Sequence, residues 1–216
     1  MKDLTRAFAA GVMSCIVLLA GCTKATPQPA VPAIPDLSSD APALSQLQNR
    51  LLSQDDLPEG FEETTLPTGQ GGFGSLISCP SLEPPAAGAD EARVSFAGVA
   101  VGNIIAESVR LTGPAQSHQV LADLARLPQQ CNVTAPATAL ALGKESTALE
   151  LNATLSGTGT VVKGYIAGLR DDQVLVLVVY VSPGTADRAT FDSVTRVAWE
   201  KAASPAVTQP SPTIGS

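Results

Sequence analysis

The first 21 residues most constrain which part of this chain can fold, because they form a segment that export would remove. Lys2 and Arg6 give the segment a basic start, and residues 7–20 follow as a mostly apolar stretch. A stretch of about fourteen residues is typical of a signal-peptide core, whereas a membrane-spanning helix needs roughly 20. We therefore expect the folded part of the chain to begin well after residue 21.

The apolar stretch ends in Leu19-Ala20-Gly21-Cys22, which places small residues directly before a cysteine. This ending resembles the lipobox of bacterial lipoproteins. The resemblance implies that residues 1–21 are a cleaved signal peptide and that Cys22 carries a thioether-linked diacylglycerol as the first mature residue. The alternative is an ordinary cleaved signal in which the cysteine is incidental. We predict a lipid anchor at Cys22 that holds the protein to the extracytoplasmic side of the cell membrane.

The charge of the mature chain limits its partners. The full chain has a formal net charge of −7, and removing residues 1–21 takes away two basic residues and one acid, which leaves it still more acidic. Nucleic acids bind proteins that present a basic face, and anionic lipids attract polybasic segments. We therefore expect no nucleic-acid partner, and we expect membrane attachment to depend on the acyl groups at Cys22.

Once Cys15 has left with the signal peptide and Cys22 is acylated, Cys79 and Cys131 remain. In an exported chain an even number of remaining cysteines most simply pairs. Closing a loop of roughly 50 residues stabilises a fold by on the order of 4 kcal/mol in the chain-entropy model. A redox-active pair is the alternative, but such pairs typically have the C-x-x-C spacing, which these two lack. We predict one structural disulfide, Cys79–Cys131.

Two proline-rich segments flank the expected domain. Residues 22–42 carry Pro27, Pro29, Pro32, Pro35 and Pro42 among small polar residues. This composition favours extended chain and predicts a tether that can span up to roughly 60 Å at about 3 Å per residue. Residues 204–216 have a similar composition and predict a disordered tail. Residues 43–203 then have the length of a single domain.

The first half of the domain shows short periodic segments. Leucines at helical spacing predict a helix over residues 43–53. The strands that we predict before residue 112 span residues 61–66, 73–79, 93–96 and 104–111. A helix over residues 114–127 follows, with Pro114 at an allowed first-turn position and Pro128 ending it.

The second half predicts strands over residues 146–155, 159–169 and 173–182, with a turn at residues 170–173 that makes the last two a hairpin. Residues 174–179 are apolar without alternation, which is typical of a central strand covered on both faces. A helix is expected from an N-cap at Thr185 to about Ala202. Its packing face holds Phe191, Val194, Val197 and Ala198, and Trp199 is expected to anchor its end. The predicted class is α+β, with three helices packed on a largely antiparallel sheet in a single domain with one disulfide.

Three features carry a resemblance to a known family. Leu51-Leu52-Ser53 leads to the run from Asp56 to Phe61, a helix precedes the second cysteine of the Cys79–Cys131 interval, and the hairpin from Tyr165 to Val181 precedes a long helix. Over residues 44–203 these features resemble the extracellular sensor domain of actinobacterial PknH-type serine/threonine kinases and the free-standing lipoproteins that share it. The resemblance implies a compact α+β domain with a groove for an extracellular ligand. The chain differs from the kinases in having no kinase domain or spanning helix.

The residues that could carry chemistry are few. His118 is the single histidine, which is too little for a usual zinc site or for a triad without a recognisable serine elbow. Residues 69–74 match G-x-G-x-x-G, but dinucleotide binding needs that turn between a strand and a helix, and here a strand-like run follows. We interpret the stretch as a loop beside a groove.

The remaining candidates have structural explanations as well. Five carboxylates crowd one stretch and could hold a hard cation, but their spacing misses the EF-hand pattern and we expect a solvated surface. They are Asp55, Asp56, Glu59, Glu62 and Glu63. Asp171 and Asp172 suit an ordinary turn. Asn132 and Asn152 begin glycosylation sequons, for which a bacterial lipoprotein rarely has the machinery.

We therefore expect no catalytic residues, no cofactor and no metal. The predicted function is a non-catalytic, sensor-like domain on a lipid anchor that binds a small molecule, an envelope lipid or cell-wall fragment, or an envelope protein. One alternative is an enzyme that cleaves envelope glycans with carboxylates alone, which requires two acids about 5–10 Å apart. Another is a structural assembly factor, which would present a flat apolar patch instead of a pocket.

Overall fold

Seven strands form one antiparallel sheet in the computed structural model, which describes residues 45–66, 74, 77–79 and 90–204. The strands are β1 (Phe61–Glu63), β2 (Glu91–Gly98), β3 (Ile104–Leu111), β4 (Thr134–Ala137), β5 (Glu145–Thr154), β6 (Val161–Arg170) and β7 (Val174–Pro183). Their order across the sheet is β1-β2-β3-β7-β6-β5-β4, and every neighbouring pair is antiparallel. The predicted α+β class with a largely antiparallel sheet is confirmed.

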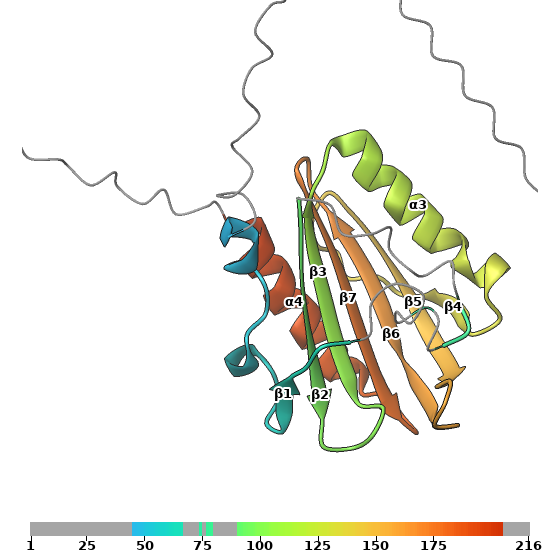
Figure 1. Cartoon of the computed structure of the whole chain (residues 1–216). Helices are drawn as coiled ribbons and strands as arrows, with labels where there is room; N and C mark the ends of the chain where they lie inside the picture. The colour runs from blue at the N-terminus through green and yellow to red at the C-terminus, as the bar shows by residue number, and fades with distance from the viewer. Residues whose placement is uncertain (1–44, 67–73, 75–76, 80–89, 205–216) are drawn as a thin grey trace, which may run out of the picture. The chain divides into compact units, whose positions relative to one another are not determined.

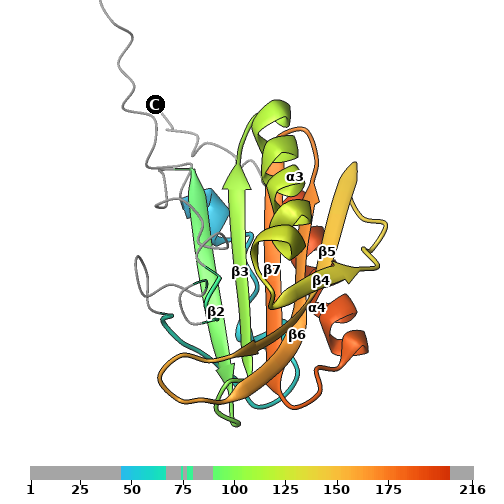
Figure 2. The same ribbon diagram turned by 90° about the vertical axis from the view of Figure 1, so that its right-hand side faces the viewer.

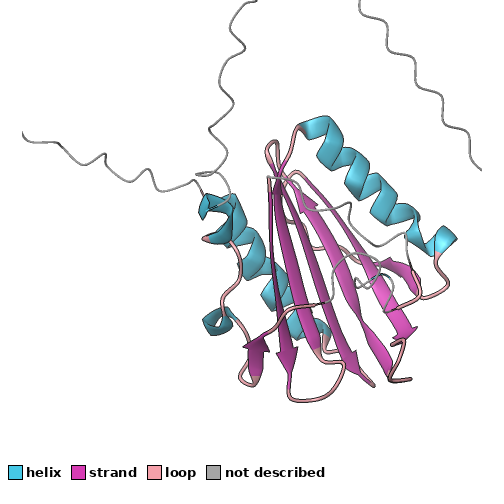
Figure 3. Cartoon of the chain, viewed as in Figure 1, coloured by secondary structure: helices cyan, strands magenta, loops and turns pink. Residues whose placement is uncertain are grey.

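Two long helices cover opposite faces of this sheet (Figures 1 and 3). Helix α3 (Pro114–Gln130) packs on β4, β5 and β6, and helix α4 (Arg188–Ala203) packs on β6 and β7. A helical turn over residues 45–48 and the 3-10 helix η1 (Gln54–Asp56) come before the first strand. No helix within the described ranges is long and apolar enough to cross a membrane.

Strand β7 lies at the centre of the sheet and is buried on both faces. It pairs with β3 on one edge and with β6 on the other. Val176, Val178 and Tyr180 enter the core under α4, whereas Val181 enters the core under α3. A strand buried on both faces reads as a continuous apolar run, so the prediction made for residues 174–179 is confirmed.

The sheet therefore separates two hydrophobic cores. The core under α4 takes in Leu47, Leu51 and Leu52, which precede η1, together with the inward face of α4. The buried residues on that helix face are Phe191, Val194, Thr195, Ala198 and Ala202, with Val197 and Trp199 partly buried against them. The core under α3 is built around Leu124, Leu127 and the two cysteines.

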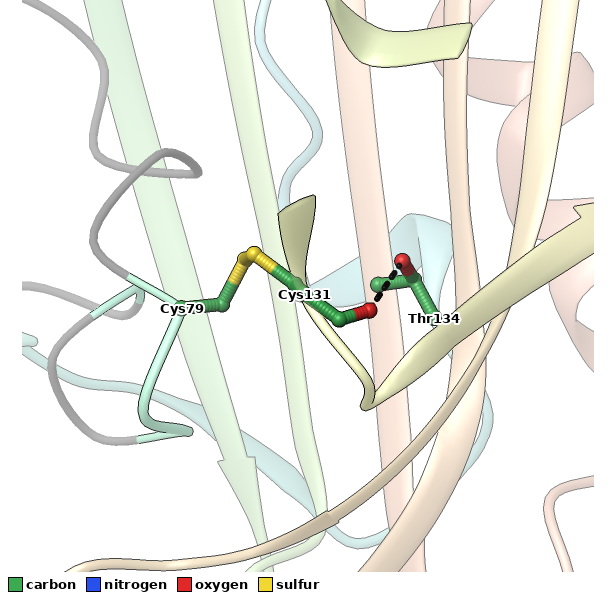
Figure 4. The surroundings of a disulfide bond; sticks show 3 residues. All are labelled: Cys79, Cys131 and Thr134. Carbon is green, nitrogen blue, oxygen red and sulfur yellow. Dashed lines mark hydrogen bonds between the residues drawn. A yellow bond between two sulfur atoms is a disulfide. The ribbon is translucent and has the colours of Figure 1, made fainter. Parts of the chain in front are cut away.

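The disulfide Cys79–Cys131 is present, as predicted, with its Cα atoms 5.6 Å apart (Figure 4). Cys131 follows α3 directly, and its carbonyl oxygen accepts a hydrogen bond from the Thr134 hydroxyl at 3.2 Å. Both sulfur-bearing side chains are buried in the core under α3. The disulfide thus fixes the end of α3 to a segment that lies far earlier in the chain.

The strand predicted over residues 73–79 is wrong at its described positions. Gly74 is helical, Ile77 and Ser78 form a turn, and the Cys79 N–H donates to the Gly74 carbonyl at 2.7 Å. Such a bond closes the chain on itself, which an extended strand does not allow. The apolar run at Ile77 and Cys79 reflects burial under α3 and not strand pairing.

Both long helices also differ from the prediction at one end. Helix α3 continues through Pro128 to Gln130, because a proline in the last turn forfeits a single backbone hydrogen bond and the Cys131 N–H still donates to the Leu127 carbonyl at 2.8 Å. Helix α4 starts at Arg188 and not after Thr185. Its N-cap is Asp187, whose carboxylate accepts from the Ala189 and Thr190 N–H groups.

Smaller differences concern strand and helix lengths. The helix expected over residues 43–53 is helical at residues 45–48 and turns afterwards, β1 stops at Glu63, and β2 extends beyond residues 93–96 at both ends. Strand β4 was not predicted, since Thr134–Ala137 shows no apolar alternation. The predictions for the signal peptide, Cys22, the tether, residues 69–73 and residues 205–216 lie outside the described residues.

Both outer edges of the sheet are protected. On β4, the Val133 carbonyl accepts a hydrogen bond from the Asn152 N–H of β5. Because backbone groups alternate in direction along a strand, the backbone groups of Thr134 and Pro136 point away from β5, toward the open edge. The Thr134 N–H already donates to the Cys131 carbonyl, and proline has no N–H. The opposite edge is β1, which has three residues and ends in the exposed Glu62 and Glu63. Short, acidic or proline-bearing edges resist pairing with another chain.

Two glutamates are buried on opposite faces of the sheet, in contrasting surroundings. Glu91 is 5% exposed, and its two carboxylate oxygens accept from Arg93 at 2.8 and 3.0 Å and from Arg110 at 2.8 Å. Burial acts to raise the pKa of Glu91, but the hydrogen bonds and charges of Arg93 and Arg110 outweigh it and hold that pKa below its ordinary value.

Glu107 is 3% exposed and faces the core under α4, where its Oε2 accepts from the Leu52 N–H at 2.6 Å. Its Oε1 has no hydrogen-bond partner among the described residues. Burial raises the pKa of Glu107 to about 8, against the smaller opposing effects of the Leu52 hydrogen bond and Lys201. The folded state therefore favours the neutral acid at this position.

We predict that Glu107→Gln changes how stability depends on pH. The unfolded glutamate loses its proton near pH 4.5 and the folded one near pH 8, so the wild type loses stability as pH rises between these values, by at most about 1.4 kcal/mol per pH unit. The variant lacks this loss. Urea unfolding of both proteins at pH 5, 6.5 and 8 should show a difference that grows in favour of the variant.

Glu91→Gln is the matched control for this experiment. The pKa of Glu91 is lowered, so its contribution is present above its unfolded pKa and is lost only as pH falls through the folded pKa. Its substitution should destabilise the protein at pH 6.5 and at pH 8 alike. A free-energy difference between wild type and Glu107→Gln that stays constant from pH 5 to 8 would contradict the assignment.

Candidate functional site

Two of the cavities on the described part of the molecule lie beside helix α4. The first, about 460 Å³, adjoins the 3-10 helix η1 and includes Asp56 and Asp187 in its lining. Both carboxylates are engaged: Asp56 accepts from Ser53 and from Lys201, and Asp187 caps α4. Hydrogen bonds and the Lys201 charge hold the pKa of Asp56 below its ordinary value, although burial opposes them. Both carboxylates therefore stabilise the local structure, and neither is free to bind a ligand.

The second cavity, about 420 Å³, lies over strands β4, β5 and β6 next to the N-terminal end of α4. We call it the β5–β6 groove. The polar side chains that line it belong to Asn132, Glu150, Asn152, Lys163, Tyr165 and Thr185. Its volume falls in the range of about 300–1,000 Å³ that is common for small-molecule sites.

Strand alternation places these side chains on one face. In β5, Leu151 and Ala153 enter the core under α3, so Glu150 and Asn152 point to the other face of the sheet. The β5–β6 register puts Glu150 opposite Tyr165 and Asn152 opposite Lys163. Asn132 reaches the same place because the segment before β4 pairs beside β5. Helix α4 covers β7 and β6 but makes few contacts with β5, and the polar face there stays open.

Gly164 lets β6 and β7 approach closely beneath the groove. A Cβ atom built at this position would lie 1.9 Å from the Tyr180 carbonyl oxygen and 2.8 Å from the Val181 Cα atom, both in the backbone of β7. Only glycine avoids that overlap, and glycine inside a strand commonly marks such an approach or a bend. Figure 2 shows β6 curving as it crosses the sheet.

Tyr165 forms the wall of the groove toward α4, and buried Phe191 supports it from behind. The ring of Tyr165 stacks on Phe191 with centroids 5.1 Å apart, and the Arg188 guanidinium lies 5.0 Å from the Tyr165 ring centre. Arg188 is itself held, since it donates to the Asp192 carboxylate and to the Thr138 carbonyl at 2.6 Å each. Stacking and cation–π contacts therefore fix the position of Tyr165 before any ligand arrives.

The charged side chains of the groove are uncommitted. Within the described ranges, every lysine and arginine donates to a carboxylate or to a backbone carbonyl, except Lys163 and Arg196. Glu150, Asn132 and Asn152 likewise have exposed side chains without a hydrogen-bond partner in the described structure. The β5–β6 groove thus combines a concave shape with polar groups that are available to bind.

The residues considered from the sequence lie elsewhere, with two exceptions. The Nδ1 atom of His118, on α3, lies 2.9 Å from Oε2 of Glu145, and the same carboxylate accepts a hydrogen bond from Arg170. Asp171 and Asp172 both form ion pairs with Lys144. No three His, Cys, Asp or Glu side chains gather as a metal site in the described part of the chain. Asn132 and Asn152, considered only as glycosylation sequons, meet in the groove.

Sequence reasoning missed Glu150 and Lys163. A signal was present, because polar residues alternate with apolar ones over residues 150–154 and because Gly164 interrupts a strand. That signal marks a solvent-facing strand surface but not a hollow in it. Comparisons with models of known protein families, with curated proteins and with solved structures found no match to this chain.

We predict that Gly164→Ala destabilises the fold by about 3 kcal/mol or more, because the added methyl group meets backbone atoms that cannot rotate away. Gly113→Ala is the control, since a Cβ atom at that position meets nothing within 4 Å and its φ of −69° suits any residue. The control should cost less than about 1 kcal/mol. Urea unfolding measures both; equal, small losses would show that β6 can move away from β7.

Proposed function

We propose that this chain is a lipid-anchored protein on the extracytoplasmic side of the cell membrane. Its domain, residues 43–203, acts as a non-catalytic, sensor-like module that binds a ligand in the β5–β6 groove. The observation that carries the binding role is the concave cluster of unpaired polar side chains at Asn132, Glu150, Asn152 and Lys163. The lipobox at Cys22 supports the anchor, and the likeness to PknH-type sensor domains supports the class of function.

The placement of the groove suits such a role. The described chain begins near the C-terminal end of α4, where Arg50 donates to the Ala202 carbonyl at 3.2 Å. The groove adjoins the N-terminal end of the same helix through Thr185 and Ala186. Sixteen helical residues separate these ends by about 24 Å. The groove and the Arg50 contact thus lie at opposite ends of α4.

The two alternatives have weaker support. Glycan hydrolysis requires a pair of carboxylates that flank the scissile bond. Among the residues that the structure describes, Glu150 alone supplies a carboxylate to the β5–β6 groove. Asp56 and Asp187 share the other cavity, but both are engaged in structural hydrogen bonds. A scaffold for protein assembly would present an apolar patch of several hundred Å², whereas the large exposed apolar side chains among described residues are Val99, Val101 and Val161.

Anchoring is tested with Cys22→Ala. We expect the wild-type protein in the membrane fraction of its bacterial host, with an N-terminal peptide whose mass includes a diacylglycerol. The variant cannot form the thioether, so it should leave the membrane fraction or keep its uncleaved signal. Membrane association of a variant that is cleaved and carries no lipid would disprove the anchor at Cys22.

Binding is tested by thermal shift with the full-length chain and fractions of envelope lipids and cell-wall extract. A ligand that binds only the folded state raises the melting temperature, by an amount that grows with its concentration. We expect one fraction to do so, and we expect the double variant Asn152→Ala/Lys163→Ala to lose the response. Arg126→Ala serves as the control, because Arg126 is exposed on α3 and pairs only with Asp123.

A response that survives in the double variant would place binding outside the groove. The absence of any response from lipid, wall and small-molecule fractions would count against a ligand-binding role and favour a protein partner.

A further inference from the structure

The β5–β6 groove carries one negative side chain, Glu150, and one positive side chain, Lys163, which do not form an ion pair with each other. Glu150 on β5 and Lys163 on β6 are diagonal neighbours, because Glu150 lies opposite Tyr165 and Lys163 lies opposite Asn152. Elsewhere in the described structure most lysines and arginines pair with a carboxylate, as Arg110 does with Glu91 and Lys201 does with Asp56. The groove thus presents two separate points of opposite charge.

From this arrangement we infer that the ligand of the groove is a short peptide with a free amino terminus and a free carboxylate, a zwitterion of two or three residues. The inference rests on the proposed binding function and adds the chemical class of the ligand. Glu150 receives the ammonium group and Lys163 receives the carboxylate. A ligand of this kind has no net charge, so the acidity of the protein does not repel it.

The spacing of the two charges selects for length. Diagonal neighbours on adjacent strands have their Cβ atoms roughly 7–8 Å apart, and both side chains can extend away from each other. A free amino acid separates its charged groups by only about 3 Å, whereas each further residue adds about 3.3–3.6 Å. A dipeptide or tripeptide therefore reaches both Glu150 and Lys163, and a single amino acid does not.

The uncharged groups of the groove suit a peptide backbone. Asn132 and Asn152 each offer a carbonyl acceptor and an amide donor, which matches the donor and acceptor of a peptide group. The Tyr165 ring, fixed by Phe191 and Arg188, provides an apolar wall for a side chain. Recognition by strand addition is closed off at β4, because Thr134 and Pro136 offer no free N–H at that edge. The side chains of the groove therefore carry the recognition.

The probes are trialanine and its three blocked forms: acetylated at the amino terminus, amidated at the carboxyl terminus, and blocked at both ends. Binding to the full-length chain is measured by isothermal titration calorimetry at low salt. We expect trialanine to bind. Blocking either end should weaken binding at least ten-fold, because each blocked end loses one charge-assisted contact. Blocking both ends should abolish binding. Free alanine should bind at least ten-fold more weakly than trialanine.

Charge reversal assigns the contacts. Lys163→Glu and Glu150→Lys should each lose trialanine binding, and the double reversal Glu150→Lys/Lys163→Glu should regain it, because a peptide in the opposite direction meets the same two charges. All of these side chains are exposed, so the variants should keep the melting temperature of the wild type. Arg126→Ala should bind trialanine as the wild type does.

Three results would overturn the inference. Equal affinity for free and doubly blocked trialanine would show that the charges at the peptide ends do not contribute to binding. Binding of an oligomer of N-acetylglucosamine, without binding of trialanine, would assign the groove to a glycan. Failure of every peptide to bind would also overturn the inference. In that case the proposed function would still stand if an envelope fraction raised the melting temperature of the wild type but not that of Asn152→Ala/Lys163→Ala. A fraction that shifts both proteins equally would count against the proposed function as well.

Discussion

Burial of strand β7 on both faces is the constraint on which the rest of the described structure depends. Because its side chains are apolar on each side, two separate layers must cover it, and the chain supplies them as α3 and α4. Both edges of the strand must also be paired, which brings β3 and β6 beside it although they are far apart in sequence. The disulfide belongs to the α3 layer, whereas Leu47, Leu51 and Leu52 belong to the α4 layer. The two layers thus pack on opposite faces of the sheet around β7.

Local sequence predicted the elements whose signals are local. The unbroken apolar run of β7, the turn at residues 170–173 and the two remaining cysteines each indicated a feature that the structure contains. The errors arose where tertiary contacts outweigh local pattern. Ile77 and Cys79 looked like part of a strand because they are apolar, but they are apolar because they lie under α3. Strand β4 has little apolar character, and its place is set by pairing with β5.

The candidate site was beyond sequence reasoning for a related physical reason. Glu150 and Lys163 have the pattern of ordinary solvent-facing strand residues, and nothing local distinguishes a flat polar face from a hollow one. The groove lies where α4 leaves β5 largely uncovered and where Gly164 lets β6 approach the backbone of Tyr180 closely. Asn132 and Asn152 come together only through the pairing of the segment before β4 with β5. The sequence therefore indicated the residue types of the site without indicating that they share one surface.

The closed edges of the sheet bear on how these molecules behave as neighbours. The proposed lipid anchor would bring copies of the chain together at a membrane surface, and exposed strand edges are the places where such encounters lead to aggregation. At β4 the outward backbone offers no donor, because Pro136 lacks one and Cys131 takes that of Thr134. At β1 a new strand would meet only three residues, two of them acidic. Neither edge therefore offers a long row of free backbone donors on which a strand from another copy could pair.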